Sequence, residues 1–198
     1  MIAILDYGAG NLRSVQNTLT EIGANYTVVR DAAGLRAASR IILPGVGHFG
    51  QMMRALDDLQ VRDVLLDRIR AGAPFLGICL GLQALFEASE EAPESRGLGL
   101  FPGAVRRFPA AVRQPHMGWN QIDARPDSRL LTGLAPGTFV IFMHSYYVPE
   151  VSATAATCRY GIRYTAALES GNIFGVQFHP EKSGPAGLRI VRNFVELA

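Results

Sequence analysis

Apolar and polar residues alternate along the first ninety residues in a way that predicts strands and helices in turn. Short apolar runs predict four strands, at residues 2–6, 26–29, 40–43 and 75–78. Apolar residues at helical spacing predict four helices, at residues 11–22, 51–56, 61–71 and 80–88, with Asn11 placed to cap the first. Because strands that alternate with helices form parallel βαβ units, this half predicts an open, mostly parallel sheet flanked by helices on both faces.

The second half of the chain has a different pattern. Pro and Gly become frequent after Glu90, and short strand-like runs occur at residues 105–108, 138–143, 155–160, 166–169 and 173–178. A last helical stretch covers residues 186–197. The sequence contains no internal repeat and no linker. Residues 1–198 are therefore expected to form one α/β domain with extra antiparallel strands in its second half.

Composition narrows the kind of protein. The chain has 198 residues, of which 48% are hydrophobic and 18% charged, values typical of a globular fold. Its net charge is +2 and its basic residues are spread along the chain, so no nucleic-acid partner is predicted. The apolar runs are too short to cross a bilayer, and the first residues lack the basic region of a signal peptide. Two cysteines make no disulfide framework, so a cytoplasmic location with no membrane contact is expected.

The stretch PFLGICLGLQALF, residues 74–86, contains the first candidate for chemistry. Gly77 and Gly81 stand two residues to either side of Cys79, where a predicted strand joins a predicted helix. Gly-x-nucleophile-x-Gly at such a join is the pattern of a nucleophile elbow, whose turn leaves no room for side chains at the flanking positions. A helix N-terminus favours a thiolate, and the amide of Leu80 would point to where an oxyanion forms. The alternative is a cysteine that only packs in the core.

The stretch GVQFHPEK, residues 175–182, contains a matching base. His179 follows an apolar run, at the end of a strand where sites form in open α/β sheets. Glu181 lies two residues further on, so in an extended backbone both side chains face the same way, and Pro180 stiffens the pair. Since a nucleophilic thiol needs a base and the base needs an orienting group, Cys79, His179 and Glu181 are predicted to form a catalytic triad. A solvated histidine at a strand end is the alternative.

The remaining histidines and the second cysteine give weaker signals. His48 follows a glycine loop and is expected at the surface or at a helix cap, and His116 has no charged residue near it in sequence. His144 ends a predicted strand, where it either lines the same cleft or is structural. Cys158 lies within a predicted strand and is expected to be structural. The chain has no Cys-x-x-Cys pair and no two histidines at ligand spacing, so no metal site is predicted.

Together these motifs resemble those of the class I, triad-type glutamine amidotransferases. The stretch GICLGLQ, residues 77–83, is similar to the nucleophile segment of that family, and FHPE, residues 178–181, to its base segment. The resemblance implies a flavodoxin-like single domain that hydrolyses glutamine to glutamate and ammonia through a cysteine thioester, with no metal or organic cofactor. Four more stretches resemble one branch of the family: DYGAGN at 6–11, PGVGHFG at 44–50, MGWN at 117–120 and HSYY at 144–147.

In that branch the glutaminase chain is paired with a separate cyclase chain, so the resemblance implies a heterodimer in which ammonia passes to the cyclase. It also implies roles for individual residues. The oxyanion and the glutamine substrate are expected to be held by Gly45, Val46, Gly47, Leu80, Gln83, Ser145 and Tyr146. The cyclase is expected to contact Asn11, Met117, Trp119 and Lys182, the only lysine of the chain. A core position for Trp119 and a purely structural role for Gln83 are the alternatives.

The loop around Val46 has a further consequence. Its glycines let a peptide plane turn at little steric cost, so the second oxyanion donor is expected to be movable. A loop that rests with a carbonyl towards Cys79 would leave the oxyanion unsupported. The glutaminase is therefore expected to be nearly silent until its partner turns the loop.

Two rival functions share some of these residues. An amidotransferase of the aminodeoxychorismate or anthranilate type, or a stand-alone γ-glutamyl hydrolase, would use the same triad, but the stretches MGWN and DYGAGN argue against both. A non-catalytic binding module of flavodoxin-like fold would keep Cys79 only for packing. A glutamine-analogue electrophile such as diazo-oxo-norleucine would separate enzyme from binding module, because a packing thiol stays unmodified.

Overall fold

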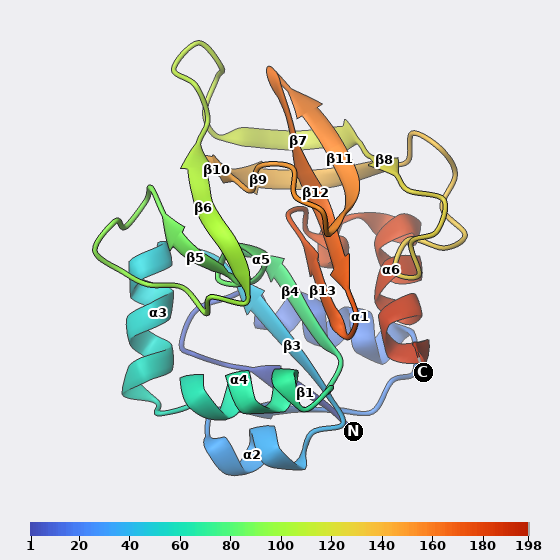
Figure 1. Ribbon diagram of the computed structural model, residues 1–198. Helices are drawn as coiled ribbons and strands as arrows, with labels where there is room; N and C mark the ends of the chain where they lie inside the picture. Colours follow the sequence, from blue (N-terminus) through green and yellow to red (C-terminus); the bar gives the residue numbers. More distant parts are fainter. Residues whose placement is uncertain (198) are drawn as a thin grey trace.

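The computed structural model describes residues 1–197, which form three β-sheets with helices packed around the largest (Figure 1). The elements follow one another as β1 (Ile2–Leu5), α1 (Leu12–Glu21), β2 (Tyr26–Val29), α2 (Ala32–Ala37), β3 (Arg40–Gly45), α3 (Phe49–Asp58), α4 (Arg62–Arg70), β4 (Phe75–Cys79), α5 (Leu80–Gln83), β5 (Phe86–Ser89), β6 (Phe101–Arg107), β7 (His116–Gln121), β8 (Asp123–Ala124), β9 (Phe139–His144), β10 (Tyr146–Tyr147), β11 (Thr154–Tyr160), β12 (Ile162–Ser170), β13 (Ile173–Val176), the 3₁₀ turn η1 (Pro180–Lys182) and α6 (Gly184–Glu196).

The main sheet has eight strands in the order β2-β1-β3-β4-β13-β12-β11-β8. The strands from β2 to β13 are parallel, whereas β12, β11 and β8 continue the sheet in antiparallel pairing. The predicted fold class, an open and mostly parallel sheet with antiparallel additions from the second half, is confirmed. Two smaller sheets, β10-β6-β5 and β7-β9, lie above the carboxyl ends of the parallel strands in Figure 1.

Helices cover both faces of the main sheet because its central strands are apolar on both sides. Every residue of β1 is buried, with Ala3 and Leu5 in one core cluster and Ile2 and Ile4 in the other. The first cluster includes apolar side chains of α2, α3 and α4, and the second includes those of α1 and α6. This two-sided burial fixes β4, and with it Cys79, in the middle of the sheet.

The helix predicted at residues 80–88 is wrong in its extent. The helix α5 ends at Gln83, and the chain continues as β5, which pairs with β6. The physical reason is a competing set of partners: the Ala84 and Glu87 carbonyls accept from the amides of Leu98 and Gly97, at 2.7 and 2.9 Å. Backbone groups that would have continued the helix are thus used by a loop far along the chain.

The sequence prediction also missed the elements α2, β5, β7, β8 and β10, and it gave Asn11 the wrong contact. Asn11 occupies the N-cap position of α1, but its side chain makes no capping hydrogen bond to the helix backbone. Its amide instead donates to Glu181, 170 residues away, at 3.2 Å. Separately, across residues 1–197 the structure has no helix that is both long enough and apolar enough to cross a membrane.

Candidate active site

Cys79 lies on a strained turn at the carboxyl end of β4. Its backbone has φ +54° and ψ −106°, a region that residues with a side chain rarely adopt. The flanking glycines permit the turn, because a Cβ on Gly77 would collide with the Gly81 carbonyl and one on Gly81 with the Leu43 carbonyl. The nucleophile elbow predicted from the sequence is therefore present, and Cys79 is 5% exposed at the base of a cavity.

His179 and Glu181 lie beside it as a hydrogen-bonded pair. The Nδ1 of His179 donates to Oε1 of Glu181 at 2.8 Å, and the side chains are 4% and 2% exposed. The reason given from the sequence is wrong: Glu181 lies in the 3₁₀ turn η1 and not in extended backbone, so it is the turn that brings the carboxylate back to the ring. Because Nδ1 is occupied, Nε2 is the ring nitrogen that faces Cys79.

The electrostatics of His179 favour a charged ring. Burial alone would lower the pKa of His179, but hydrogen bonds to Cys79 and Glu181 and the negative charges of both outweigh it and raise the pKa. Glu181 Oε1 also accepts from Asn11, while Glu181 Oε2 is buried without a hydrogen-bond partner among residues 1–197. The site thus favours an imidazolium at His179, next to the sulfur of Cys79.

A cavity of about 260 Å³ opens in front of the elbow. Cys79 and His179 share its lining with six of the predicted substrate residues, namely Val46, Gly47, Leu80, Gln83, Ser145 and Tyr146. Gly45 does not line it: a Cβ there would press on Leu80 and on the Gly81 amide, so this glycine is required for packing against the elbow. Gln83 is buried, and its Nε2 donates to the carbonyl of Tyr146 at 2.9 Å and to Gln177 Oε1 at 3.0 Å.

Glu91 is a lining residue that the sequence reasoning missed. It is the only carboxylate of the cavity lining, and its Oε2 accepts from the Phe49 amide at the start of α3 at 2.8 Å. A carboxylate fixed in this way is suited to an ammonium group. Its sequence surroundings, EASEEAPE, contain four glutamates without a distinguishing pattern, so only the fold separates Glu91 from its neighbours.

The loop predicted to supply the second oxyanion donor has one of its amides, that of Val46, bonded to another residue. The Val46 amide donates to the Tyr7 hydroxyl at 3.2 Å, and the same hydroxyl donates to the Val46 carbonyl at 3.3 Å. Gly47 has φ +96° and open space around its Cα, so the loop can turn there without a collision. Burial raises the pKa of Tyr7 to about 12, which keeps the hydroxyl neutral and able to both donate and accept. Tyr7 was not a predicted site residue.

A chain of hydrogen bonds runs from Tyr146 into the core. His144 Nδ1 donates to the Tyr146 carbonyl at 2.8 Å, so His144 Nε2 accepts from the Tyr164 hydroxyl at 3.3 Å. The Tyr164 oxygen then accepts from His116 Nδ1 at 3.0 Å, and His116 Nε2 accepts from Asn120 at 3.3 Å. Since a carbonyl can only accept, the first bond sets the direction of all the others. His144 also lines the cavity, as one of its two predicted roles required.

Neutral rings are needed for that chain, and burial provides them. Burial lowers the pKa of His116 to about 4 and that of His144 to about 3, and it raises the pKa of Tyr164 far above the usual value. His48, by contrast, caps α3, where its side chain accepts from the Gly50 amide. Burial raises the pKa of the free Cys158 thiol to about 11, so this thiol stays protonated at neutral pH.

Four residues predicted at a partner interface divide into two kinds. Met117 and Trp119 are 64% and 55% exposed, which excludes the core position considered for Trp119. Lys182 is exposed on η1, next to the triad. Asn11 is half-buried, and its side chain is bonded to Glu181 and to Ser14. Asn11 therefore belongs to the support of the triad as well as to any surface it shares with a partner.

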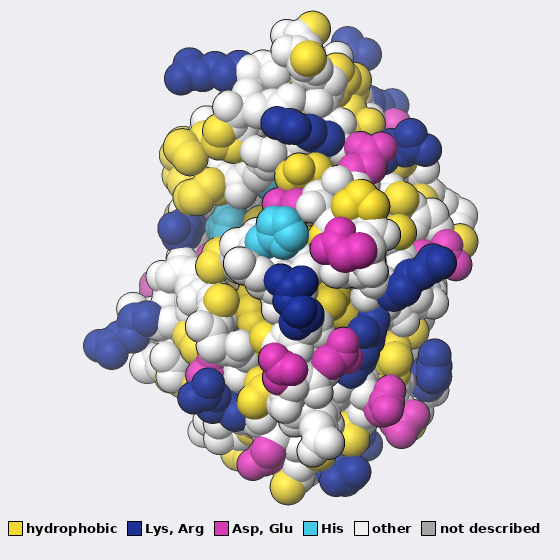
Figure 2. All heavy atoms as spheres, turned by 90° about the vertical axis from the view of Figure 1, so that its left-hand side faces the viewer, with side chains coloured by type: hydrophobic (Ala, Val, Ile, Leu, Met, Phe, Trp, Pro, Cys, Tyr) yellow, Lys and Arg dark blue, Asp and Glu magenta, His cyan; other side chains and the backbone are white. Residues whose placement is uncertain are grey.

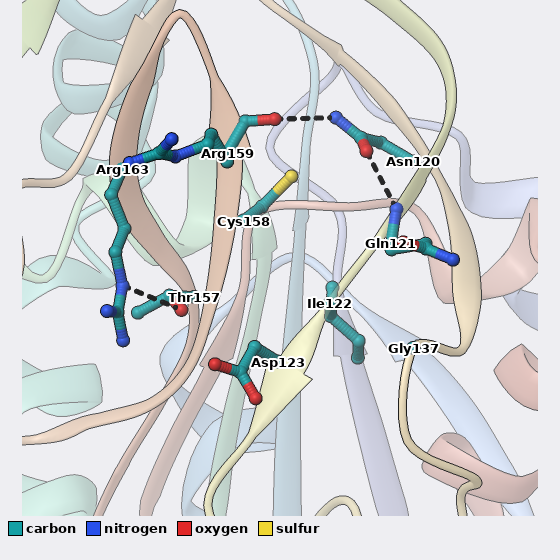
Figure 3. Close-up of a pocket in the computed structure, with 9 residues that line it drawn as sticks. All are labelled: Asn120, Gln121, Ile122, Asp123, Gly137, Thr157, Cys158, Arg159 and Arg163. Atoms are coloured by element: carbon teal, nitrogen blue, oxygen red, sulfur yellow. Dashed lines mark hydrogen bonds between the residues drawn. The ribbon is translucent and has the colours of Figure 1, made fainter.

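A second cavity, of about 480 Å³, is lined by residues of β7, β8, β11 and β12 and contains none of the predicted triad (Figure 3). Two of its polar side chains are bonded within the lining: Asn120 donates to the backbone carbonyl of Arg159 at 3.0 Å, and Arg163 donates to the Thr157 hydroxyl at 3.2 Å. Among residues 1–197, no three His, Cys, Asp or Glu side chains are grouped to hold a metal ion. The face drawn in Figure 2 carries Lys and Arg scattered among Asp and Glu, without a continuous patch of one sign.

An elbow cysteine with a histidine–glutamate pair on this fold is the arrangement of a triad amidotransferase, and the comparison with families agrees. Residues 3–197 match the family described as glutamine amidotransferase class-I. The chain belongs to that family. Solved structures show the same fold: a glutamine amidotransferase crystal structure has a TM-score of 0.78 at 22% identity, covering 98% of this chain and 97% of that one. The structure of PurLQS from Thermotoga maritima has a TM-score of 0.73 at 20% identity, covering 98% and 96%.

Two curated relatives that share one name are closer in sequence than these structures. The imidazole glycerol phosphate synthase subunit HisH of Methanothermobacter thermautotrophicus is 52% identical over 198 residues, covering 100% of this chain and 98% of the relative. The protein of the same name from Deinococcus radiodurans is 48% identical over 197 residues, covering 98% and 92%. This chain is thus similar along its whole length to that subunit.

Proposed function

We propose that the chain is the glutaminase subunit of an imidazole glycerol phosphate synthase, which works in histidine biosynthesis in the cytoplasm. It hydrolyses glutamine and delivers the ammonia to a separate cyclase subunit in a heterodimer, where imidazole glycerol phosphate and AICAR are made. The observation that carries the proposal is the elbow at Cys79, which lies beside the His179–Glu181 pair in the lining of one cavity of about 260 Å³.

The residues around the cavity account for each step. The Cys79 thiolate attacks the side-chain amide carbon of glutamine, and the oxyanion is held by the Leu80 amide and by an amide of residues 45–47. His179 gives its proton to the departing ammonia, which leaves a γ-glutamyl thioester on the sulfur. His179 then takes a proton from water as the water attacks the thioester, and glutamate is released with the thiolate restored. Glu181 holds His179 in one tautomer throughout.

Substrate placement follows from the polar atoms that remain available. Both amide protons of Gln83 are used by protein acceptors, so its Oε1 is left to accept from the substrate. Ser145 and Tyr146 line the cavity, the Tyr146 carbonyl is bonded to His144, and the backbone of the two residues would take the α-carboxylate. Glu91 would take the α-ammonium, because it is the only negative group among the lining residues other than the thiolate.

The cyclase would dock on the outer face of the β7–β9 ladder. The residues of this face alternate along the two strands and are apolar except for Gln121 at the end of β7: Met117, Trp119, Phe139, Ile141 and Met143. Four of them are among the exposed large hydrophobic residues, and such a contiguous apolar face in a globular protein marks an interaction site. We call it the apolar ladder face.

The apolar ladder face is joined to the active site at two points. Met143 also lines the cavity, so a partner on this face would cover the cavity mouth. The Ile141 carbonyl accepts from the His179 amide at 2.8 Å, and the Ile141 amide donates to Ser183, which donates to the His179 carbonyl at 2.7 Å. Ammonia released at Cys79 would therefore emerge beneath the partner, near Lys182.

The deciding experiment measures ammonia release from glutamine by the chain alone and with a histidine-pathway cyclase. Release that rises with that cyclase, and not with a chorismate-using enzyme, would support the proposal and reject the rival amidotransferases. Labelling of Cys79 by diazo-oxo-norleucine tests the nucleophile separately. Trp119 fluorescence should shift when the cyclase saturates the chain, and an unchanged spectrum would remove the apolar ladder face as the docking site.

A further inference from the structure

A buried amide that takes no part in the steps above lies against the nucleophile. Gln177 is fully buried, and its Nε2 lies 3.6 Å from the Cys79 sulfur, within the range of a hydrogen bond to sulfur. Its Oε1 accepts from Gln83 Nε2 at 3.0 Å. One side chain thus contacts both the reacting atom and a residue of the substrate pocket.

The main sheet fixes the position of this side chain. Val176, the last residue of β13, pairs with Ile78 in the parallel ladder of β13 and β4. Gln177 directly follows β13, and Cys79 is the last residue of β4. The Gln177 amide donates to the Ala166 carbonyl at 2.8 Å, which ties its backbone to β12. Gln177 therefore reaches the sulfur from a backbone position that directly follows β13 and is hydrogen-bonded to the neighbouring strand.

The surrounding bonds determine which end of the amide faces the sulfur. The Tyr146 carbonyl can only accept, so Gln83 must present its NH₂ to it, and the same NH₂ donates to Gln177. The Gln177 atom that meets Gln83 is consequently the oxygen. Its NH₂ is then left for Cys79, and the sulfur is the acceptor.

We propose that Gln177 is a further catalytic residue, which stabilises the Cys79 thiolate by donating a hydrogen bond to it and aligns Gln83 for the substrate with its other end. The inference rests on the proposed function, since it takes Cys79 as the nucleophile. A buried amide that only filled space would carry a desolvation cost that Met or Leu would avoid. A donor aimed at an anion explains why an amide stands there.

Other titratable groups around the sulfur do not duplicate this role. His179 is the one cation, and Tyr7 and Tyr164 lie close enough for the charge of Cys79 to act on them, with pKa values that keep both neutral. Neutral His144 and the Glu91 carboxylate line the same cavity. Glu91 opposes a thiolate and His144 is bonded to Tyr146, so Gln177 and His179 are the side chains that favour the anion.

The test is the pH dependence of Cys79 alkylation by iodoacetamide in the full chain, with Cys158→Ala as the common background so that one thiol reacts. Gln177→Met keeps the shape of the side chain and removes both bonds. We expect the midpoint of the alkylation profile to rise by about one pH unit, which is about a tenfold loss of thiolate below the midpoint. Gln177→Glu, whose carboxylate cannot donate, should raise it at least as far.

Asn172→Ala is the matched control. The Asn172 side-chain amide also makes two partly buried hydrogen bonds, to the Ile69 and Ala73 carbonyls at 2.8 Å each. They lie at the opposite end of β4 from Cys79. It should lower the melting temperature without moving the midpoint. If Gln177→Met fails to fold, Gln177→Glu provides the comparison.

The outcomes separate the two claims. An unchanged or lower midpoint in the folded Gln177 variants, with a parent chain that releases ammonia from glutamine, overturns the role of Gln177 and leaves the proposed function intact. A parent chain that neither reacts at Cys79 nor releases ammonia with the cyclase overturns the proposed function itself.

Discussion

The elbow around Cys79 and the loop around Val46 lie side by side in the sheet but are held in different ways. Gly45 is the register partner of Cys79, so the two segments meet at the cavity. The elbow is fixed by close backbone contacts at Gly77 and Gly81 that any added side chain would break. The loop, by contrast, is bonded to the Tyr7 hydroxyl through Val46. It contains Gly47 at positive φ, where an added Cβ would meet no atom within 4 Å.

This contrast separates the preformed part of the site from the adjustable part. Cys79 and the His179–Glu181 pair, predicted as nucleophile, base and orienter, lie together in the structure, whereas the Val46 amide, one of the candidate oxyanion donors, is bonded to Tyr7. A turn of one peptide plane costs little at a glycine, while reshaping the elbow would mean breaking packed backbone contacts. Control of this enzyme by its partner is therefore expected to act on the loop.

The largest expected effect comes from the elbow. Cys79→Ser should lower glutamine hydrolysis at least about 10⁴-fold, because a hydroxyl is a far weaker nucleophile than a thiolate in this site. The fold should persist, since the side chain shrinks only slightly, and the complex should still use free ammonium. Ammonia release measures the loss of glutamine hydrolysis, and thermal melting measures whether the fold persists. Retention of most of the activity would mean that Cys79 is not the nucleophile.

Adding the cyclase should give the next largest change in the rate of glutamine hydrolysis. We expect the cyclase to act on the loop around Val46. Loss of one oxyanion donor costs roughly 100- to 1000-fold in rate, so glutamine hydrolysis should rise at least about 100-fold when the cyclase and its ligand are both present. Steady-state ammonia release with and without each component is the measurement. If the isolated chain already hydrolysed glutamine at the rate of the complex, the loop would not be a gate, although the triad would stand.

Glu91 should affect substrate binding and change neither the elbow nor the loop. Glu91→Gln removes the charge that would meet the substrate ammonium, so KM should rise about tenfold with little change in kcat. Glu90→Gln is the matched control, because the Glu90 carboxylate accepts from the Arg107 amide and does not line the cavity. A fall in kcat at constant KM would instead place Glu91 in the chemical step.

The elbow was predictable from sequence because its chemistry is local. Gly77, Cys79 and Gly81 lie within five residues, and this spacing by itself indicates a tight turn. The pairing of His179 with Glu181 was predicted correctly, but the predicted backbone conformation was wrong. An extended backbone was expected at Glu181, and the chain forms a 3₁₀ turn there.

The groups that the sequence did not reveal are those brought to the site from turns and bends outside the elbow's own segment. Gln177, Glu91 and Tyr7 reach the site across 98, 12 and 72 positions from Cys79, and their local sequence carries no sign of it. The ladder strand β7 was missed for a different physical reason. Its apolar residues Met117 and Trp119 face outwards and its inward positions include a histidine and a glycine, which reverses the usual pattern of a half-buried strand.

The smallest effect tests the loop directly. Tyr7→Phe removes the hydroxyl that holds both the amide and the carbonyl of Val46 and keeps the buried ring, so the loop should reach its active orientation more often. One hydrogen bond is worth about 1 kcal/mol, so partner-independent hydrolysis should rise about fivefold while the rate of the full complex stays the same. The degree of stimulation by the cyclase should fall by the same factor. Tyr26→Phe is the matched control, since its hydroxyl bonds only to Thr20 on the surface. A lower basal rate in Tyr7→Phe would show that the hydroxyl supports the active loop, and the elbow and the loop would then be equally preformed.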